Sequence, residues 1–179
     1  MRRHAHFIWT PRQKIDYDVT FRSLLVGGAI RRDEGVNRWF LFRRCFDLPQ
    51  VPSAATLRIF ADSRYQLFVN GVRVGRGPGR ASPAFARVDE YDLKAALQSG
   101  TNVVAVLVHV YGVDTAWYET VKDYTQSIFG DGGLYVYGEF RCDNRMTLLA
   151  SDESWRVVQC AAWKGDAPRS GWGQGFIED

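Results

Sequence analysis

The residues best suited to binding chemistry lie at the start of a long segment that runs from Gly112 to Asp131. The candidate carbohydrate-binding residues are Tyr111, Asp114, Trp117, Tyr118 and Glu119. Sugars present apolar C–H faces that pack on aromatic rings, and hydroxyl groups that carboxylates and amides hydrogen-bond. This stretch carries both kinds of side chain close together, so it is the candidate ligand site of the chain.

A packing role competes with ligand binding for the same aromatic residues. Trp117 and Tyr118 would then close one end of the fold or pack against a further domain, and we favour this interpretation over ligand binding. Exposed apolar clusters usually mark contact surfaces. The candidate residues for a domain interface near the C-terminal end are Trp163, Trp172 and Phe176.

Catalysis by the loop would have to use its carboxylates, which are Asp114, Glu119, Asp123 and Asp131. Glycoside hydrolysis requires two carboxylates that are about 5 to 10 Å apart across one bond. Acids in surface loops are usually only solvated, so we assign no catalytic residue.

A metal site has little support in the sequence. His4 and His6 lie near the N-terminus, and His109 lies in an apolar stretch, where we expect a histidine with a satisfied hydrogen bond. Calcium takes about six to eight oxygen ligands, and no such set is evident. We assign no metal ligand and no cofactor, and a structural calcium ion stays open.

The charge balance argues against a nucleic-acid partner, because 23 basic and 20 acidic residues give a net charge of only +3. No apolar run approaches the length that spans a membrane, and no signal peptide is visible, so we expect a cytoplasmic protein. Cys45, Cys142 and Cys160 are expected to be free and mostly buried thiols, with one disulfide plus one free thiol as the alternative.

The elements that must position the loop are strands. Apolar and polar residues alternate along residues 55–61 and 65–69, which is typical of strands with one buried face. Asn70-Gly71 follows, and this pair favours a tight hairpin turn. We therefore predict three consecutive antiparallel strands between Ala55 and Gly79.

Further strands are predicted on both sides of this stretch. Their ranges are 38–48, 85–91, 101–110, 133–140, 146–150 and 155–158, and one helical turn is predicted over 92–97. In the first of them Phe40, Phe42 and Phe46 share one face. Roughly eight or nine short strands with little helix indicate an all-β, antiparallel two-sheet β-sandwich of the jelly-roll type.

An ordered set of motifs resembles a known family. The motifs are Ala61-Asp62, Tyr65 to Gly71, Gly77-Pro78, Tyr91-Asp92-Leu93, Asn102 to Val106, Gly132-Gly133-Leu134, Ser151 to Val157 and Gly175 to Glu178. They are similar to the galactose-binding-like β-sandwich that precedes the catalytic domain of bacterial α-L-rhamnosidase-type glycoside hydrolases. The similarity covers nearly the whole chain.

The resemblance implies a domain layout and a partner. Residues 1–179 form a single β-sandwich domain, with 1–37 as an N-terminal extension and 161–179 as a tail that leads to a catalytic domain. That domain is an (α/α)6 barrel of the same parent protein, whose acidic residues perform the chemistry in the family. This chain contains no barrel sequence, so no catalytic residue is carried over.

Three functions follow from these observations. The first is a non-catalytic accessory β-sandwich of a rhamnosidase-like glycoside hydrolase, which supports the catalytic domain and contacts carbohydrate. The alternative is an autonomous carbohydrate-binding module. A small glycosidase in its own right is the third and the least favoured.

Overall fold

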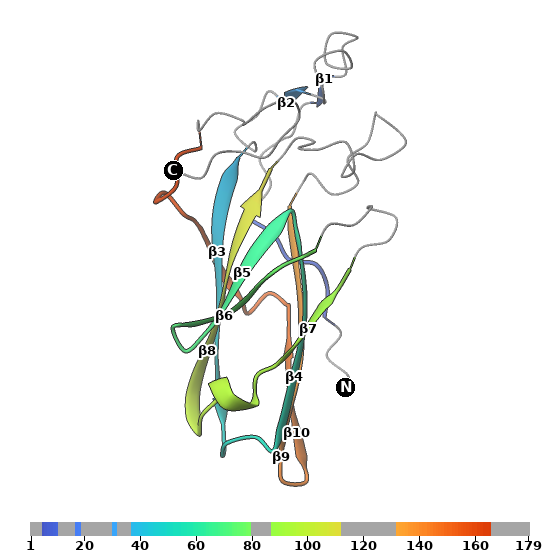
Figure 1. The fold of residues 1–179 in the computed structure, drawn as a ribbon, viewed down its shortest axis with the longest axis vertical. Coiled ribbons are helices and arrows are strands. Elements are labelled where there is room, and N and C mark those ends of the chain that lie inside the picture. The colour runs from blue at the N-terminus through green and yellow to red at the C-terminus, as the bar shows by residue number, and fades with distance from the viewer. Residues whose placement is uncertain are drawn as a thin grey trace.

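The chain forms two antiparallel sheets that face each other across one apolar core (Figure 1). The computed structural model describes residues 5–10, 37–79, 87–111 and 132–165, and the backbone of 17–18 and 30–31. The strands are β1 (Tyr17–Asp18), β2 (Ile30–Arg31), β3 (Arg38–Leu48), β4 (Ala54–Asp62), β5 (Arg64–Val69), β6 (Val72–Gly77), β7 (Asp89–Asp92), β8 (Gly100–Val110), β9 (Gly133–Cys142), β10 (Arg145–Ala150) and β11 (Arg156–Gln159). The predicted two-sheet antiparallel sandwich is confirmed.

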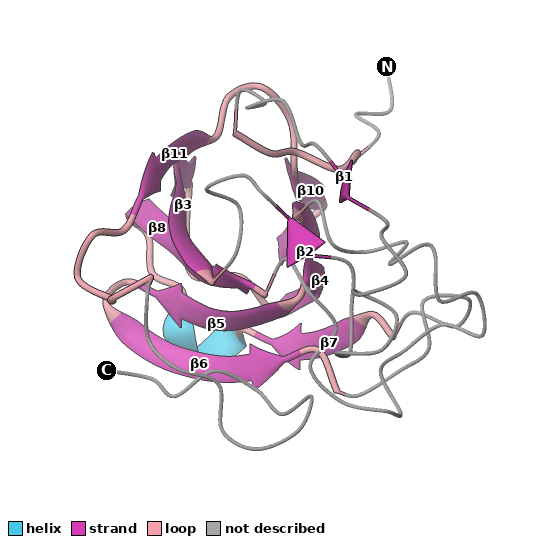
Figure 2. Cartoon of the chain, turned by 90° about the horizontal axis from the view of Figure 1, so that it is seen from above, coloured by secondary structure: helices cyan, strands magenta, loops and turns pink. Residues whose placement is uncertain are grey.

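The larger sheet has five strands in the order β11-β3-β8-β5-β6, and the smaller has four in the order β10-β9-β4-β7. Viewed from above, the two sheets curve around a common interior (Figure 2). Strands β1 and β2 pair separately with each other. The predicted helical turn is a 3-10 turn over Lys94–Ala96, and the Asp92 carboxylate accepts a hydrogen bond from the Lys94 amide at 2.9 Å.

The core follows from the period-two alternation. Val104, Val106 and Val108 of β8 are fully buried, and they face Leu57 and Ile59 of β4. The predicted face of β3 is confirmed, because Phe42 is buried in the core and Phe40 and Phe46 pack against it. In the five-stranded sheet, the residues that alternate with these core residues along each strand form the outer face of the sheet.

The predicted three-stranded meander is wrong in its first half. Strand β4 pairs with β7 and β9, whereas β5 pairs with β6 and β8, so the chain passes from one sheet to the other between them. We call Asp62-Ser63-Arg64, where this passage occurs, the corner. Alternation reports which face of a strand is buried but not which strand pairs with it, so a corner and a hairpin have the same pattern.

The second half of the predicted meander, the hairpin around Asn70-Gly71, is confirmed. Strands β5 and β6 form a hairpin whose turn residues, Asn70 and Gly71, have φ values of 50° and 83°. The Asn70 amide nitrogen donates to the Ala96 carbonyl and to the side-chain oxygen of Asn102, both at 2.9 Å. Asn102 is fully buried, and its amide nitrogen donates a hydrogen bond to the Gln98 carbonyl at 2.7 Å. This network fixes the hairpin against the 3-10 turn.

Residues 5–10 lie along the end of β9. Ile8 forms an antiparallel bridge with Leu134. Trp9 packs against Phe40 and Phe42, with ring centroids 4.9 and 5.6 Å away, and closes this end of the core.

The three cysteines are free, and no disulfide joins them. Cys142 is buried, as expected, but Cys45 is exposed and Cys160 is half-buried, so "mostly buried" holds for one of the three. Cys45 lies on the outer face of β3, which nothing in the described part of the chain covers at that point. Within the described ranges, no helix has the length and apolarity needed to cross a membrane.

Candidate functional site

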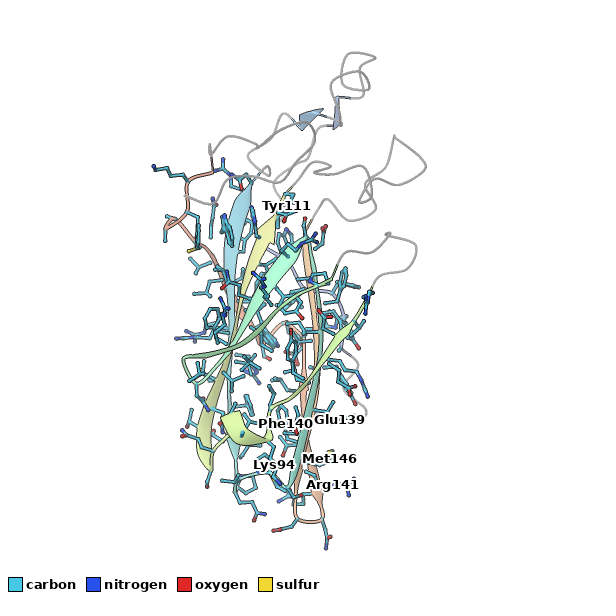
Figure 3. The ribbon with its side chains drawn as sticks, in the orientation of Figure 1. Lys94, Tyr111, Glu139, Phe140, Arg141 and Met146 are labelled. Atoms are coloured by element: carbon cyan, nitrogen blue, oxygen red, sulfur yellow. The ribbon has the colours of Figure 1, made fainter. Side chains whose placement is uncertain are left out.

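The candidate site surrounds Tyr111, at the end of β8 (Figure 3). Tyr111 is the one predicted carbohydrate-binding residue that the structure describes. The others, Asp114, Trp117, Tyr118 and Glu119, lie outside the described residues, as do Asp123 and Asp131. Their proposed roles therefore stay predictions, and the geometry below concerns the framework from which residues 112–131 leave.

The corner holds both ends of this loop. The Ser63 hydroxyl accepts a hydrogen bond from the Tyr111 amide at 3.2 Å, and the Asp62 carboxylate accepts one from the Gly132 amide at 3.2 Å. Gly132 has a φ of 78°, and a Cβ there would collide with the Trp9 ring. Asp62 is only 5% exposed, so its carboxylate has a structural role at the base of the loop.

A groove of about 480 Å³ opens beside Tyr111 on the outer face of the five-stranded sheet. Its lining residues come from β3, β5, β6 and β8: Trp39, Arg64, Tyr65, Gln66, Arg73, Arg76, Gly77, Pro78, Gly79, Leu107, His109 and Tyr111. Arg64 lies 5.5 Å from the centre of the Tyr111 ring, in a cation–π contact. The groove thus combines aromatic, amide and guanidinium groups.

Aromatic rings stack at one end of the groove. Trp39 lies between Trp163, at a ring distance of 4.4 Å, and His109, at 3.9 Å. Tyr111 meets the edge of His109 at 4.7 Å. Trp39 points away from the core but is only 4% exposed, because residues 160–165 cross over it.

His109 is a buried, neutral histidine. Its Nε2 lies 2.7 Å from the side-chain oxygen of Asn37, whose amide nitrogen donates to the carbonyls of Lys164 and Gly165. Since the Asn37 oxygen accepts, Nε2 carries the proton. Burial, and then the Arg64 charge, lower the pKa of His109 to about 3. The expectation of a histidine with a satisfied hydrogen bond is confirmed.

Of the three predicted interface residues, the structure describes one. Trp163 is described and stacks on Trp39 of its own chain. Trp172 and Phe176 lie outside the described residues. A contact with a further domain stays a prediction for all three.

The rim of the groove at the end of β6 is held by a polar cluster. The Tyr65 hydroxyl donates to the Asp89 carboxylate at 2.6 Å and lies 3.1 Å from the Tyr91 hydroxyl. Burial, and then the hydrogen bond to Asp89, raise the pKa of Tyr65 well above its usual range. A Cβ on Gly77 would collide with the Asp89 carboxylate, so glycine leaves room for that carboxylate beside β6.

Sequence reasoning missed the arginines of the groove. Arg73 and Arg76 lie in β6, and the sequence pattern of this strand points to no partner or ligand for them. The sequence pattern that could have indicated the groove is in β5, where Arg64 and Gln66 alternate with buried Tyr65 and Leu67 and therefore lie on the outer face. Among the described residues, no three His, Cys, Asp or Glu side chains come together in a way that would hold a metal ion.

The fold is that of a known family of β-sandwich modules. A family model described as "Alpha-L-rhamnosidase N-terminal domain" matches residues 50–167, and the chain belongs to this family. A β-galactosidase of Arthrobacter sp. (strain B7) is 32% identical over 96 residues, which are 50% of this chain and 9% of that protein.

Solved structures agree with this membership. The GH78 family rhamnosidase of Bacillus sp. GL1 is 39% identical with a TM-score of 0.66, over 80% of this chain and 14% of that one. A lectin of Pleurotus ostreatus is 22% identical with a TM-score of 0.55, over 97% of this chain and 38% of that one, which shows a shared fold. This chain therefore spans a small part of the relatives that it matches.

The His109 environment predicts a pH-dependent stability. The unfolded histidine titrates near ~6.5, so the unfolded state binds the extra proton as the pH falls. The free energy of unfolding should therefore decrease as the pH falls between the two pKa values, by about 2.5 kcal/mol from pH 7 to pH 4.5. Urea unfolding at both pH values measures this change. His109→Gln, which keeps a hydrogen-bond donor, should depend less on pH, and an identical dependence would contradict this assignment.

Proposed function

We propose that this chain is a non-catalytic accessory β-sandwich of a rhamnosidase-like glycoside hydrolase, and that it packs against an (α/α)6 catalytic barrel of the same parent protein. The observation that carries the proposal is the family match over residues 50–167. The small share of each relative that the chain spans, 14% for the rhamnosidase of Bacillus sp. GL1, supports a modular role.

The described acids near the groove support a non-catalytic role. Asp62 is buried and accepts from the Gly132 amide, and Asp89 is bound to Tyr65. No carboxylate is among the lining residues of the groove, in so far as the structure describes them. Hydrolysis of a glycosidic bond by the usual mechanisms needs two such groups on either side of the bond.

The accessory role predicts that the isolated chain does not hydrolyse an aryl α-L-rhamnoside above the rate without protein. Release of the aryl alcohol, followed by absorbance, measures this. Turnover that disappears in Asp114→Asn or Glu119→Gln would contradict the proposal, because the loop would then carry a catalytic carboxylate.

A second candidate function is carbohydrate binding by the groove. Tyr111 provides an aromatic ring, and Gln66 and the arginines provide planar hydrogen-bonding groups beside it. These are the chemical requirements for holding a sugar ring and its hydroxyl groups. In this view Asp114, Trp117, Tyr118 and Glu119 extend the same site from the loop that begins at Tyr111.

Binding predicts that rhamnose- or galactose-containing oligosaccharides quench tryptophan fluorescence on titration. Trp117→Ala should abolish most of the quenching, and Tyr111→Ala should weaken the affinity by about tenfold, as expected for loss of about 1.4 kcal/mol. Tyr137→Ala, on the outer face of the other sheet, is the matched control and should leave the affinity unchanged. Flat titrations across a glycan panel, with and without Ca²⁺, would reject this function.

A further inference from the structure

The groove beside Tyr111 has a chemical character that narrows its ligand. We propose that it binds an acidic carbohydrate, and that Arg73 and Arg76 hold the carboxylate groups of its uronic-acid residues. This inference rests on the second candidate function, carbohydrate binding, and specifies the class of sugar.

The strand register arranges the groove in rows across the outer face of the sheet. Arg64 and Trp39 both lie opposite His109, which forms the first row. Gln66 lies opposite both Leu107 and Arg76, which forms the second. Neighbouring rows on one face of a sheet are about 7 Å apart, because alternate residues along a strand point to the same side.

A third row extends the basic surface. Phe68 lies opposite both Ala105 and Arg73. Arginines therefore occur in three successive rows, and Arg73 and Arg76 follow one another along β6. Cationic groups spaced along a strand suit an extended chain that carries repeated negative charges.

The described lining of the groove is basic, although the Asp89 carboxylate, which accepts a hydrogen bond from Tyr65, lies at its rim. Its lining contains three arginines, and no acidic side chain is among the lining residues that the structure describes. Arg73 and Arg76 are exposed, and neither guanidinium is paired with a carboxylate of the described residues. As far as the described residues go, both groups are therefore open to a ligand from solvent.

The other sheet provides the contrast. Its outer-face Arg58 lies 2.9 Å from Glu90 and 3.7 Å from Glu139, so its charge is compensated within the fold. Glu139 is far from Tyr111 along the length of the sandwich (Figure 3). Among the described residues, positive charge is thus less compensated on the five-stranded sheet, where Arg43 and Arg156 line a second pocket, than at Arg58 of the four-stranded sheet.

Guanidinium chemistry favours carboxylates. Arginine presents a planar fork of N–H groups that matches the two oxygens of a carboxylate, and such charged hydrogen bonds are about twice as strong as neutral ones. The volume of about 480 Å³ lies within the range of small-molecule sites. Tyr111 and Gln66 supply the contacts that a sugar ring needs in addition to its charge.

The rim of the groove is fixed before any ligand arrives. The Tyr91 hydroxyl donates to the Arg76 carbonyl at 3.2 Å and lies 3.1 Å from the Tyr65 hydroxyl, which donates to Asp89. A preorganised site loses less conformational freedom when it binds. The backbone that presents Arg76 is therefore held in place by the fold.

Isothermal titration of the full chain with a short oligogalacturonide, and with its fully methyl-esterified form, tests the proposal. The two probes differ in charge but share their sugar rings. We expect the acid to bind at least tenfold more tightly than the ester. Arg76→Gln and Arg73→Gln should each weaken binding of the acid by about tenfold, as loss of one charged hydrogen bond predicts.

Arg43→Gln is the matched control, because Arg43 lies on the outer face of β3 but outside the lining of this groove. It removes the same charge and should leave the affinity for the acid unchanged. Near-ultraviolet circular dichroism verifies that each variant, altered only at an exposed position, keeps its tertiary structure.

Three results would overturn the proposal. Equal affinity for the acid and its ester would leave carbohydrate binding in place but remove the requirement for charge. Equal weakening by Arg76→Gln and Arg43→Gln would mean unspecific attraction to the basic sheet. Absence of binding to either probe would mean that the groove serves another occupant, such as an acidic segment of a neighbouring domain. The accessory role is measured separately by the hydrolysis assay, so its failure is distinguishable from each of these.

Discussion

The rest of this structure depends on the passage of the chain from one sheet to the other at Asp62-Ser63-Arg64. Strand β4 ends in the four-stranded sheet and β5 begins in the five-stranded sheet, so the corner joins the two layers at one end of the core. Its first two side chains accept hydrogen bonds from the amides at the two ends of the long loop, and its third contacts Tyr111. One short segment therefore connects the layers and positions the candidate site.

The groove follows from how that end of the sandwich is closed. Trp9 fills the core from one side, and residues 160–165 cover the outer face of β3 through the Trp163–Trp39 stack. His109 can remain neutral in this setting because Asn37 satisfies its Nε2 and, in turn, binds the tail carbonyls. Removing the side chain of either Asn37 or His109 would leave the other as a buried polar group without this partner, which is costly in a low-dielectric interior.

Much of the fold could be predicted from the sequence because burial has a local signature. The alternation in β4 and β5 and the Asn70-Gly71 turn each indicate their own local structure, and the three phenylalanines of β3 identify its core face. Sheet membership could not be predicted in the same way. The partners of β4 are β7 and β9, which both lie further along the chain, and no local pattern distinguishes that arrangement from a hairpin with β5.

The candidate site was less accessible to sequence reasoning. Tyr111 was singled out as part of an aromatic and acidic loop, and the structure describes its framework but not residues 112–131. Trp39 belongs to the solvent-facing parity of its strand, and its burial depends on a tail more than a hundred residues later. The arginines of β6 are ordinary surface residues in the sequence, and they become a group only when the register sets them beside Gln66 and Tyr111.

Amide hydrogen exchange of the Asp62→Ala and Ser63→Ala variants, followed by nuclear magnetic resonance, tests the central role of the corner most directly. In the unaltered chain, the amides of Tyr111 and Gly132 should exchange slowly, because each donates to a corner side chain. Ser63→Ala should speed exchange at Tyr111 alone, and Asp62→Ala should speed it at Gly132. Unchanged protection of both amides in both variants would contradict the account, since the loop would then be held by other contacts.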